Sequence, residues 1–113
     1  MKTLITLILF PLVLFGQQKI LIPMDLKQTN HLKAYGIAFW TLEKGIEIDW
    51  LLNYRGGSFM VDNIAGVANE CRIRGVAFEQ ISGGNATQIL GEIAGEDNNM
   101  DVVRLEKAPK VAV

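Results

Sequence analysis

The sequence predicts an α/β fold, a three-layer Rossmann-like parallel sheet that makes up an incomplete N-terminal domain. Two observations predict it. Three short apolar stretches (residues 19–23, 46–52 and 76–81) alternate with three segments of helical periodicity. Right-handed crossovers that join such strand–helix units produce a parallel sheet with helices on both faces.

The first 16 residues read as a secretory signal peptide. Lys2 supplies a short positive region, residues 4–15 form an apolar run, and Gly16 marks an abrupt change to polar composition. The run is shorter than the roughly 20 residues that a spanning helix needs, so we expect an exported chain, periplasmic or extracellular, with no membrane span after cleavage. Residues 17–108 are the predicted α/β domain, and residues 109–113 the start of a further domain missing from this chain.

The first strand–helix unit opens the predicted domain. Residues 19–23 (KILIP) are almost continuously apolar, which is typical of a parallel strand covered on both faces. Thr29 or Asn30 is the expected N-cap of a helix that runs to about Lys44 and is stopped by Gly45. Its predicted apolar face consists of Leu32, Tyr35, Gly36 and Phe39, with Leu42 close by. Ile37 and Trp40 widen this face, so we expect burial on more than one side.

The second and third units repeat the pattern. Apolar residues alternate with polar ones in the central strand, residues 46–52, and residues 58–61 can add a short extended segment. A second helix is predicted from Asp62 or Asn63 to Arg74, ended by Gly75. Its apolar face is Ile64, Val67, Ala68 and Cys71.

A third strand (residues 76–81) and a third helix follow, and residues 101–105 fit either a strand or an extended linker. The third helix would turn Ile89, Leu90, Ile93 and Ala94 inward. Cys71, the only cysteine, lies on an apolar helix face, so we expect a small buried hydrophobic residue rather than a catalytic thiol.

The loops that follow the strands are the predicted ligand-binding edge. Residues 25–30, 53–58 and 82–85 are polar, and in a parallel sheet all three would lie at the carboxyl edge, where open α/β folds bind ligands. The candidate ligand-binding residues in these loops are Asp25, Asn30, His31, Asn53, Tyr54, Arg55, Gly56, Gly57, Ser58, Ser82 and Asn85.

Arg55 is the most suggestive of these residues. A guanidinium can bind a carboxylate or phosphate through two hydrogen bonds, and Gly56 and Gly57 let backbone N–H groups approach an anion. The other interpretation is a strand-ending turn with an exposed arginine. His31, the only histidine, fits an acid–base role or a solvent-facing helix position.

Charge and composition limit the partners. A net charge of −1 provides no basic field, so we expect no nucleic-acid partner. One histidine and one cysteine do not support a transition-metal site, and no cofactor is evident. Glu47 and Asp49 point to one strand face, where we expect a partly exposed strand rather than a catalytic acid pair.

The loop SGGNAT (residues 82–87) is similar to the Ser-Gly-Gly-x-Asp-Ser/Thr loop of ATP pyrophosphatases, which include the synthetase half of asparagine synthetase. It also has the strand–loop–helix context of that family. Ala86 replaces the family's aspartate, which removes the carboxylate expected to help hold magnesium.

Most of the chain after residue 16 resembles exported bacterial proteins described as asparagine synthetase B-like. The resemblance rests on KILIPMDLKQTNHLKAYGIAFWTLEKGIEIDWLLNYRGGSF (residues 19–59), ECRIRGVAFE (70–79) and NMDVVRLEKAPKVAV (99–113). Such proteins are longer, which agrees with the missing domain inferred above. The family name implies glutamine- and ATP-dependent amidation of aspartate, with ATP as cofactor. The family's N-terminal cysteine nucleophile has no counterpart, because Gln17 is the predicted first residue, and no catalytic residue carries over.

Three functions remain open from the sequence. The first is an exported domain that binds a small anionic ligand at the carboxyl edge of its sheet. The second, implied by the resemblance, is an amidotransferase or synthetase activity of the full-length protein. The third is a structural domain that packs against the missing part.

Overall fold

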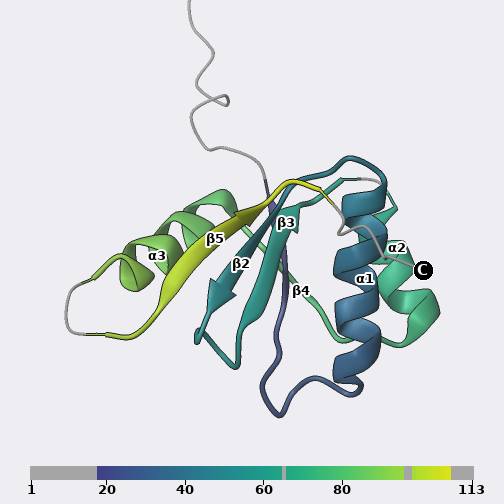
Figure 1. Cartoon of the computed structure of the whole chain (residues 1–113), viewed down its shortest axis with the longest axis horizontal. Helices are drawn as coiled ribbons and strands as arrows, with labels where there is room; N and C mark the ends of the chain where they lie inside the picture. Colours follow the sequence, from purple (N-terminus) through teal and green to yellow (C-terminus); the bar gives the residue numbers. More distant parts are fainter. Residues whose placement is uncertain (1–17, 65, 96–97, 108–113) are drawn as a thin grey trace, which may run out of the picture.

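A computed structural model describes residues 18–64, 66–95 and 98–107 of the chain (Figure 1). Eight elements follow one another, and their bounds define the fold. They are β1 (Lys19–Ile22), α1 (His31–Glu43), β2 (Ile48–Leu52), β3 (Ser58–Asp62), α2 (Val67–Arg74), β4 (Glu79–Ile81), α3 (Gly83–Ile93) and β5 (Asp101–Leu105).

The strands form one five-stranded sheet in the order β4-β1-β3-β2-β5. Every neighbouring pair is antiparallel, for example Ile20 opposite Val61 in β1 and β3. The prediction of a parallel Rossmann-like sheet is therefore wrong. The first six elements instead follow the β-α-β-β-α-β order of the split β-α-β arrangement.

The error arises at the connection after β2. The prediction treated residues 53–58 as a loop that leads to a helix and allowed only a short extended segment at 58–61, but Ser58–Asp62 is a full strand that pairs directly with β2. Two strands joined by a short turn must run antiparallel, because a parallel pair needs a crossover of a dozen or more residues. The chain thus inserts β3 between β1 and β2, and each of these two strands becomes antiparallel to it.

Helix α1 begins and ends as predicted, but its buried face only partly matches the predicted one. Asn30 is its N-cap, since the side chain accepts a hydrogen bond from Lys33 N, and Gly45 has a left-handed φ of +82° after the last turn. Leu32, expected in the core, is 82% exposed. The face against the sheet consists of Ala34, Ile37, Ala38, Thr41 and Leu42.

Helix α2 and strand β4 are shorter than predicted. α2 begins at Val67 after Gly66, not at Asp62, which ends β3, and Ile64 is exposed. Val67, Ala68 and Cys71 are buried as predicted. β4 has three residues rather than the six predicted for residues 76–81.

Helices cover both faces of the sheet (Figure 1). α1 and α2 pack on one face over a core that includes Ile20, Ile22 and Phe59. α3 packs on the other face, where Ala86 and Ile93 meet Leu21, Leu51 and Met60. Ile89 and Leu90 contribute as partly buried residues of the same cluster.

α3 leads the chain from β4, at one edge of the sheet, to β5, at the opposite edge. Residues 101–105, which fitted either a strand or a linker, form the strand β5 and pair with all five residues of β2.

Two predictions lie outside the described residues: the signal peptide over residues 1–16 and the start of a further domain at residues 109–113. Among the helices that the structure describes, none has the length and apolar character to cross a membrane.

Candidate functional site at the loop end of the sheet

The antiparallel sheet divides the predicted ligand-binding residues between its two ends. Ile22 lies opposite Phe59, so the β1–α1 loop and the β2–β3 turn meet at one end, called here the loop end. Lys19 lies opposite Ile81, so the segment after β4 is at the other end. The loop end holds Asp25, Asn30, His31, Asn53, Tyr54, Arg55, Gly56, Gly57 and Ser58, and Ser82 and Asn85 are at the opposite end.

The β2–β3 turn has a dense run of left-handed backbone. Asn53 and Arg55 have φ values of +64° and +46°, and Gly56 and Gly57 have +84° and +96°. Positive φ is uncommon outside glycine, and such strain persists only where the surroundings fix it. At Gly56 a β-carbon would lie 2.5 Å from the carbonyl oxygen of Met24, so the two loops are in direct backbone contact.

Hydrogen bonds fix the Arg55 backbone from both sides. Its carbonyl oxygen accepts from Met24 N at 3.1 Å and from the Ser58 hydroxyl at 3.3 Å. The amides of Gly57 and Ser58 donate to the Tyr54 carbonyl at 2.9 and 3.0 Å, so both are used within the turn. The turn thus holds the arginine in one place rather than presenting a row of free amides.

The Arg55 guanidinium lies between two carboxylates from two other segments. Its Nε donates to Asp25 Oδ2 at 2.9 Å, and its Nη1 lies 3.1 and 3.0 Å from the two Glu79 oxygens. The hydrogen bond from Arg55 lowers the pKa of Asp25, and the bonds to Asp25 and then Glu79 raise the pKa of Arg55 despite partial burial. The three side chains are 24 to 39% exposed, so the cluster reaches the surface.

Four further predicted residues serve mainly to shape this end. The His31 ring Nε2 lies 2.9 Å from the Met24 carbonyl oxygen, and Asn30 caps α1. Asn53 donates from its side chain to the carbonyl of Asn99, which connects the turn to the segment before β5. Tyr54 packs beneath α3, and burial raises the pKa of its hydroxyl.

Ser82 and Asn85 have a local role at the other end. The Ser82 hydroxyl accepts a hydrogen bond from Asn85 N at 3.0 Å, which makes Ser82 the N-cap of α3. Neither residue lies with the Arg55 cluster. The convergence of all three loops, which the parallel sheet implied, is therefore limited to two of them.

Glu79 is the member of the cluster that sequence reasoning missed. Glu79 lies in the stretch 76–81, and nothing in that stretch indicates that its carboxylate binds Arg55. It reaches Arg55 because β4 pairs with β1, with Glu79 opposite Leu21, and this pairing is not a local property of the sequence. No local signal in the sequence therefore connects Glu79 with Arg55.

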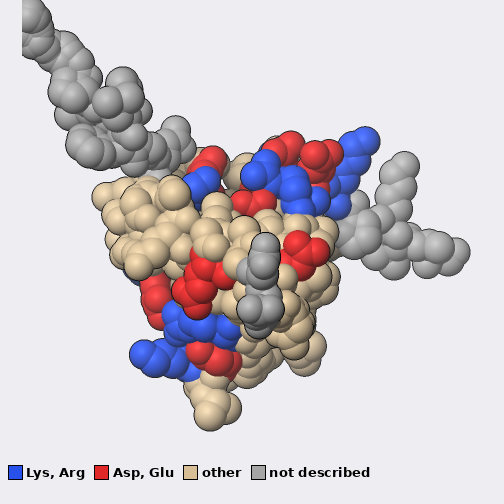
Figure 2. Space-filling model, turned by 90° about the vertical axis from the view of Figure 1, so that its left-hand side faces the viewer, with Lys and Arg blue, Asp and Glu red and all other residues tan. Residues whose placement is uncertain are grey.

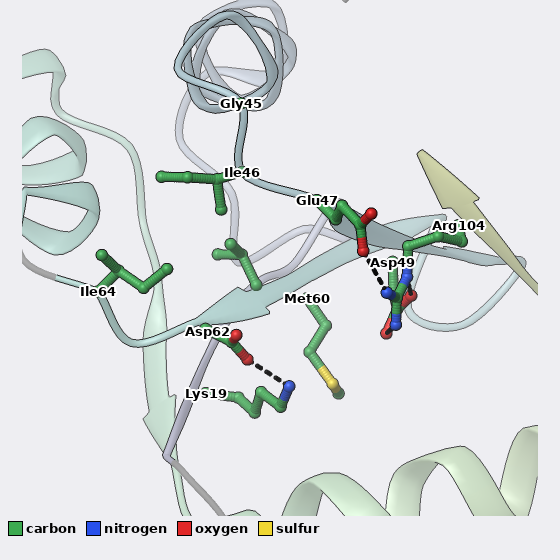
Figure 3. Close-up of a pocket in the computed structure, with 10 residues that line it drawn as sticks. Lys19, Gly45, Ile46, Glu47, Asp49, Met60, Asp62, Ile64 and Arg104 are labelled. Carbon is green, nitrogen blue, oxygen red and sulfur yellow. Dashed lines mark hydrogen bonds and ion pairs between the residues drawn. The ribbon is translucent and has the colours of Figure 1, made fainter. Parts of the chain in front are cut away.

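Charged side chains gather in two groups on the α3 side of the molecule, one near the top of the view in Figure 2 and one at its lower left. The group away from the loop end borders a shallow hollow of about 280 Å³ (Figure 3). Arg104 donates there to Asp49 at 2.6 Å and to Glu47 at 2.7 Å, and Lys19 pairs with Asp62. Both cations of the hollow are thus paired with carboxylates, as Arg55 is at the loop end.

The predictions for Glu47, Asp49 and Cys71 can be compared with the structure. Glu47 is exposed and Asp49 buried, and both bind the same arginine, whose pKa they raise. Cys71 is fully buried as expected, and burial raises the pKa of its thiol to about 11. That thiol carries almost no thiolate at neutral pH, so it is unsuited to nucleophilic chemistry. Among the described residues, no group of three or more metal-ligating side chains is found.

Comparison with family models, with curated proteins and with solved structures found no match to this chain. The resemblance to asparagine synthetase B-like proteins therefore stays a prediction.

Proposed function

We propose that this chain is an exported domain that binds a small molecule bearing an anionic group at Arg55. The observation that carries the proposal is the way the arginine is held. Its backbone is left-handed, its carbonyl oxygen is bonded by two groups, and its guanidinium is bonded by two carboxylates. Strained positions that the surroundings fix so completely occur preferentially at ligand sites.

The guanidinium retains capacity for a ligand. Asp25 occupies Nε and Glu79 occupies Nη1, and within residues 18–64, 66–95 and 98–107 no partner is found for Nη2. An arginine fixed in advance loses little side-chain entropy on binding, which favours affinity. Export is proposed on the character of residues 1–16 alone.

The test is a thermal-shift screen of the purified chain against carboxylates, phosphates and sugars. A molecule that binds only the native state raises the melting temperature by mass action. We expect a shift with at least one small anion, lost in Arg55→Ala. Arg104→Ala is the matched control, because Arg104 also lies between two carboxylates but at the opposite end of the sheet. It should lower stability and retain the shift.

Two outcomes would contradict this proposal. A shift that survives Arg55→Ala would place the ligand elsewhere, and no shift with any anion would favour a domain that only packs against other parts of the protein. The amidotransferase alternative, which rests on the resemblance, predicts instead glutamine- or ATP-dependent turnover by the full-length protein.

A further inference from the structure

We propose that Glu79 determines the specificity of the Arg55 site. It would select a carboxylate that carries a hydrogen-bond donor, a hydroxyl or an ammonium group, on the adjoining carbon, over a plain carboxylate. This inference rests on the proposed function, since it names the class of ligand that the site would take.

The geometry places a ligand beside Glu79. Both Glu79 oxygens lie within 3.1 Å of Arg55 Nη1, and Nη2, the nitrogen left for a ligand, is bonded to the same carbon of the guanidinium. An anionic group on Nη2 therefore comes close to the Glu79 carboxylate. The anionic group of the ligand and the Glu79 carboxylate are both negative, so they repel each other. The Asp25 carboxylate on Nε adds to this repulsion.

The total charge around Arg55 also offers a plain anion little attraction. One guanidinium and two carboxylates sum to a net charge of −1, which the nearby Lys27 ammonium offsets, so a plain anion gains little from the field at the site. A donor next to the ligand carboxylate turns the repulsion into a hydrogen bond with a charged acceptor, which is among the stronger kinds. A site arranged to accept from such a donor discriminates against the analogue that lacks it.

Glu79 fits this role better than Asp25. The two Asp25 oxygens are both engaged, Oδ1 by Lys27 N at 3.0 Å and Oδ2 by Arg55 Nε at 2.9 Å. Among the described residues, Arg55 is the only partner of the Glu79 side chain, which is 39% exposed on an edge strand. Asp25 is thus a positioning residue for Arg55, and Glu79 is the carboxylate that faces the ligand.

The experiment compares propionate, lactate and alanine, which differ only in the group on the second carbon. Dissociation constants are measured by calorimetry for the wild-type chain and for Glu79→Gln, which retains the size of the side chain. We expect the wild-type chain to bind lactate or alanine about tenfold more tightly than propionate, the effect of one hydrogen bond to a charged group. In Glu79→Gln, propionate should bind several-fold more tightly and the preference should shrink to about twofold or less.

Glu47→Gln is the matched control, because Glu47 has the same relation to Arg104 at the other end of the sheet. It should leave all three affinities unchanged. Equal preferences in the wild-type chain and in Glu79→Gln would overturn the inference while the proposed function stands. If none of the three compounds binds in a manner sensitive to Arg55→Ala while another anion does, the inference is overturned and the proposed function stands. If no anion does, the proposed function itself fails. The stronger ligand of lactate and alanine identifies the donor as hydroxyl or ammonium.

Discussion

At the scale of single residues, Gly45 before β2 and Gly56 in the β2–β3 turn are glycines for different reasons. Gly45 and Gly56 have almost the same φ, +82° and +84°. A β-carbon at Gly45 would meet nothing within 4 Å, whereas at Gly56 it would collide with the Met24 carbonyl. The pair thus separates the cost of a left-handed backbone from the cost of a steric clash.

We therefore predict that Gly45→Ala lowers the free energy of unfolding by about 1–2 kcal/mol, the cost of the left-handed conformation. Gly56→Ala should cost a further ~1–3 kcal/mol, because backbone atoms of the neighbouring loop must move. Urea denaturation of the two variants measures the difference. Equal losses would mean that the two loops are not in contact at Gly56.

The candidate site could be predicted from the sequence only in part, and the reason lies in particular residues. Arg55 and Asp25 were both selected from polar loops, and they do meet. Asn30 was correctly assigned as a possible cap, since capping depends on residues within one turn of helix. Glu79 was missed because its contact depends on which strands pair, and Ser82 was placed with Arg55 by a sheet of the wrong kind.

At the scale of elements, helix α1 shows why periodicity located a helix but not its buried face. Apolar residues occur on nearly every side of it, so two faces compete for the sheet. The predicted face was centred on Leu32, which is 82% exposed, while Ile37, predicted only to widen that face, is fully buried. Which face of α1 is buried depends on how the helix packs against the sheet, and that packing cannot be inferred from the helix sequence alone.

We predict that Ile37→Ala lowers the free energy of unfolding by about 2–5 kcal/mol, as expected when a fully buried side chain leaves a cavity. Leu32→Ala on the same helix should change it by less than about 0.5 kcal/mol, because an exposed side chain contributes little. Chemical denaturation of both variants provides the comparison. A larger loss for Leu32→Ala would restore the face predicted from the sequence.

The strands were easier to locate than to connect. Alternation identified β2, and the run at residues 19–23 contains β1. The glycine-rich residues 53–58 were interpreted as a loop that leads to a helix, although they join two paired strands. A strand–loop–helix unit and a β-hairpin both have a polar turn at this point. Only the length of the extended segment after the turn distinguishes them, and the prediction made that segment, residues 58–62, too short.

At the scale of the whole molecule, the ion pair between Asp25 and Arg55 makes stability depend on pH. The pKa of Asp25 is lowered from 3.8 in the folded chain, chiefly by its hydrogen bond with Arg55. A carboxyl with a lowered pKa stabilises the fold above its unfolded pKa, and this contribution is lost as the pH falls through the folded pKa.

We therefore predict that Asp25→Asn is less stable than the wild-type chain at neutral pH. The difference in melting temperature should shrink as the pH falls below about 4, where the unfolded carboxyl begins to bind its proton. In an Arg55→Ala background the same substitution should have little effect, because the partner is absent. A constant difference from pH 7 to pH 3 would show that the charge of Asp25 does not contribute.

The position of β1 in the sheet has a further consequence, for the order in which the chain folds. Lys19 pairs with Asp62, 43 residues further on, and also with Ile81. As the chain leaves the ribosome, β1 emerges first but waits unpaired until both partners have followed. The β2–β3 hairpin can form at once, because local contacts close before distant ones. During synthesis this largely apolar strand is therefore also the one exposed longest, and exposed apolar segments are prone to aggregate.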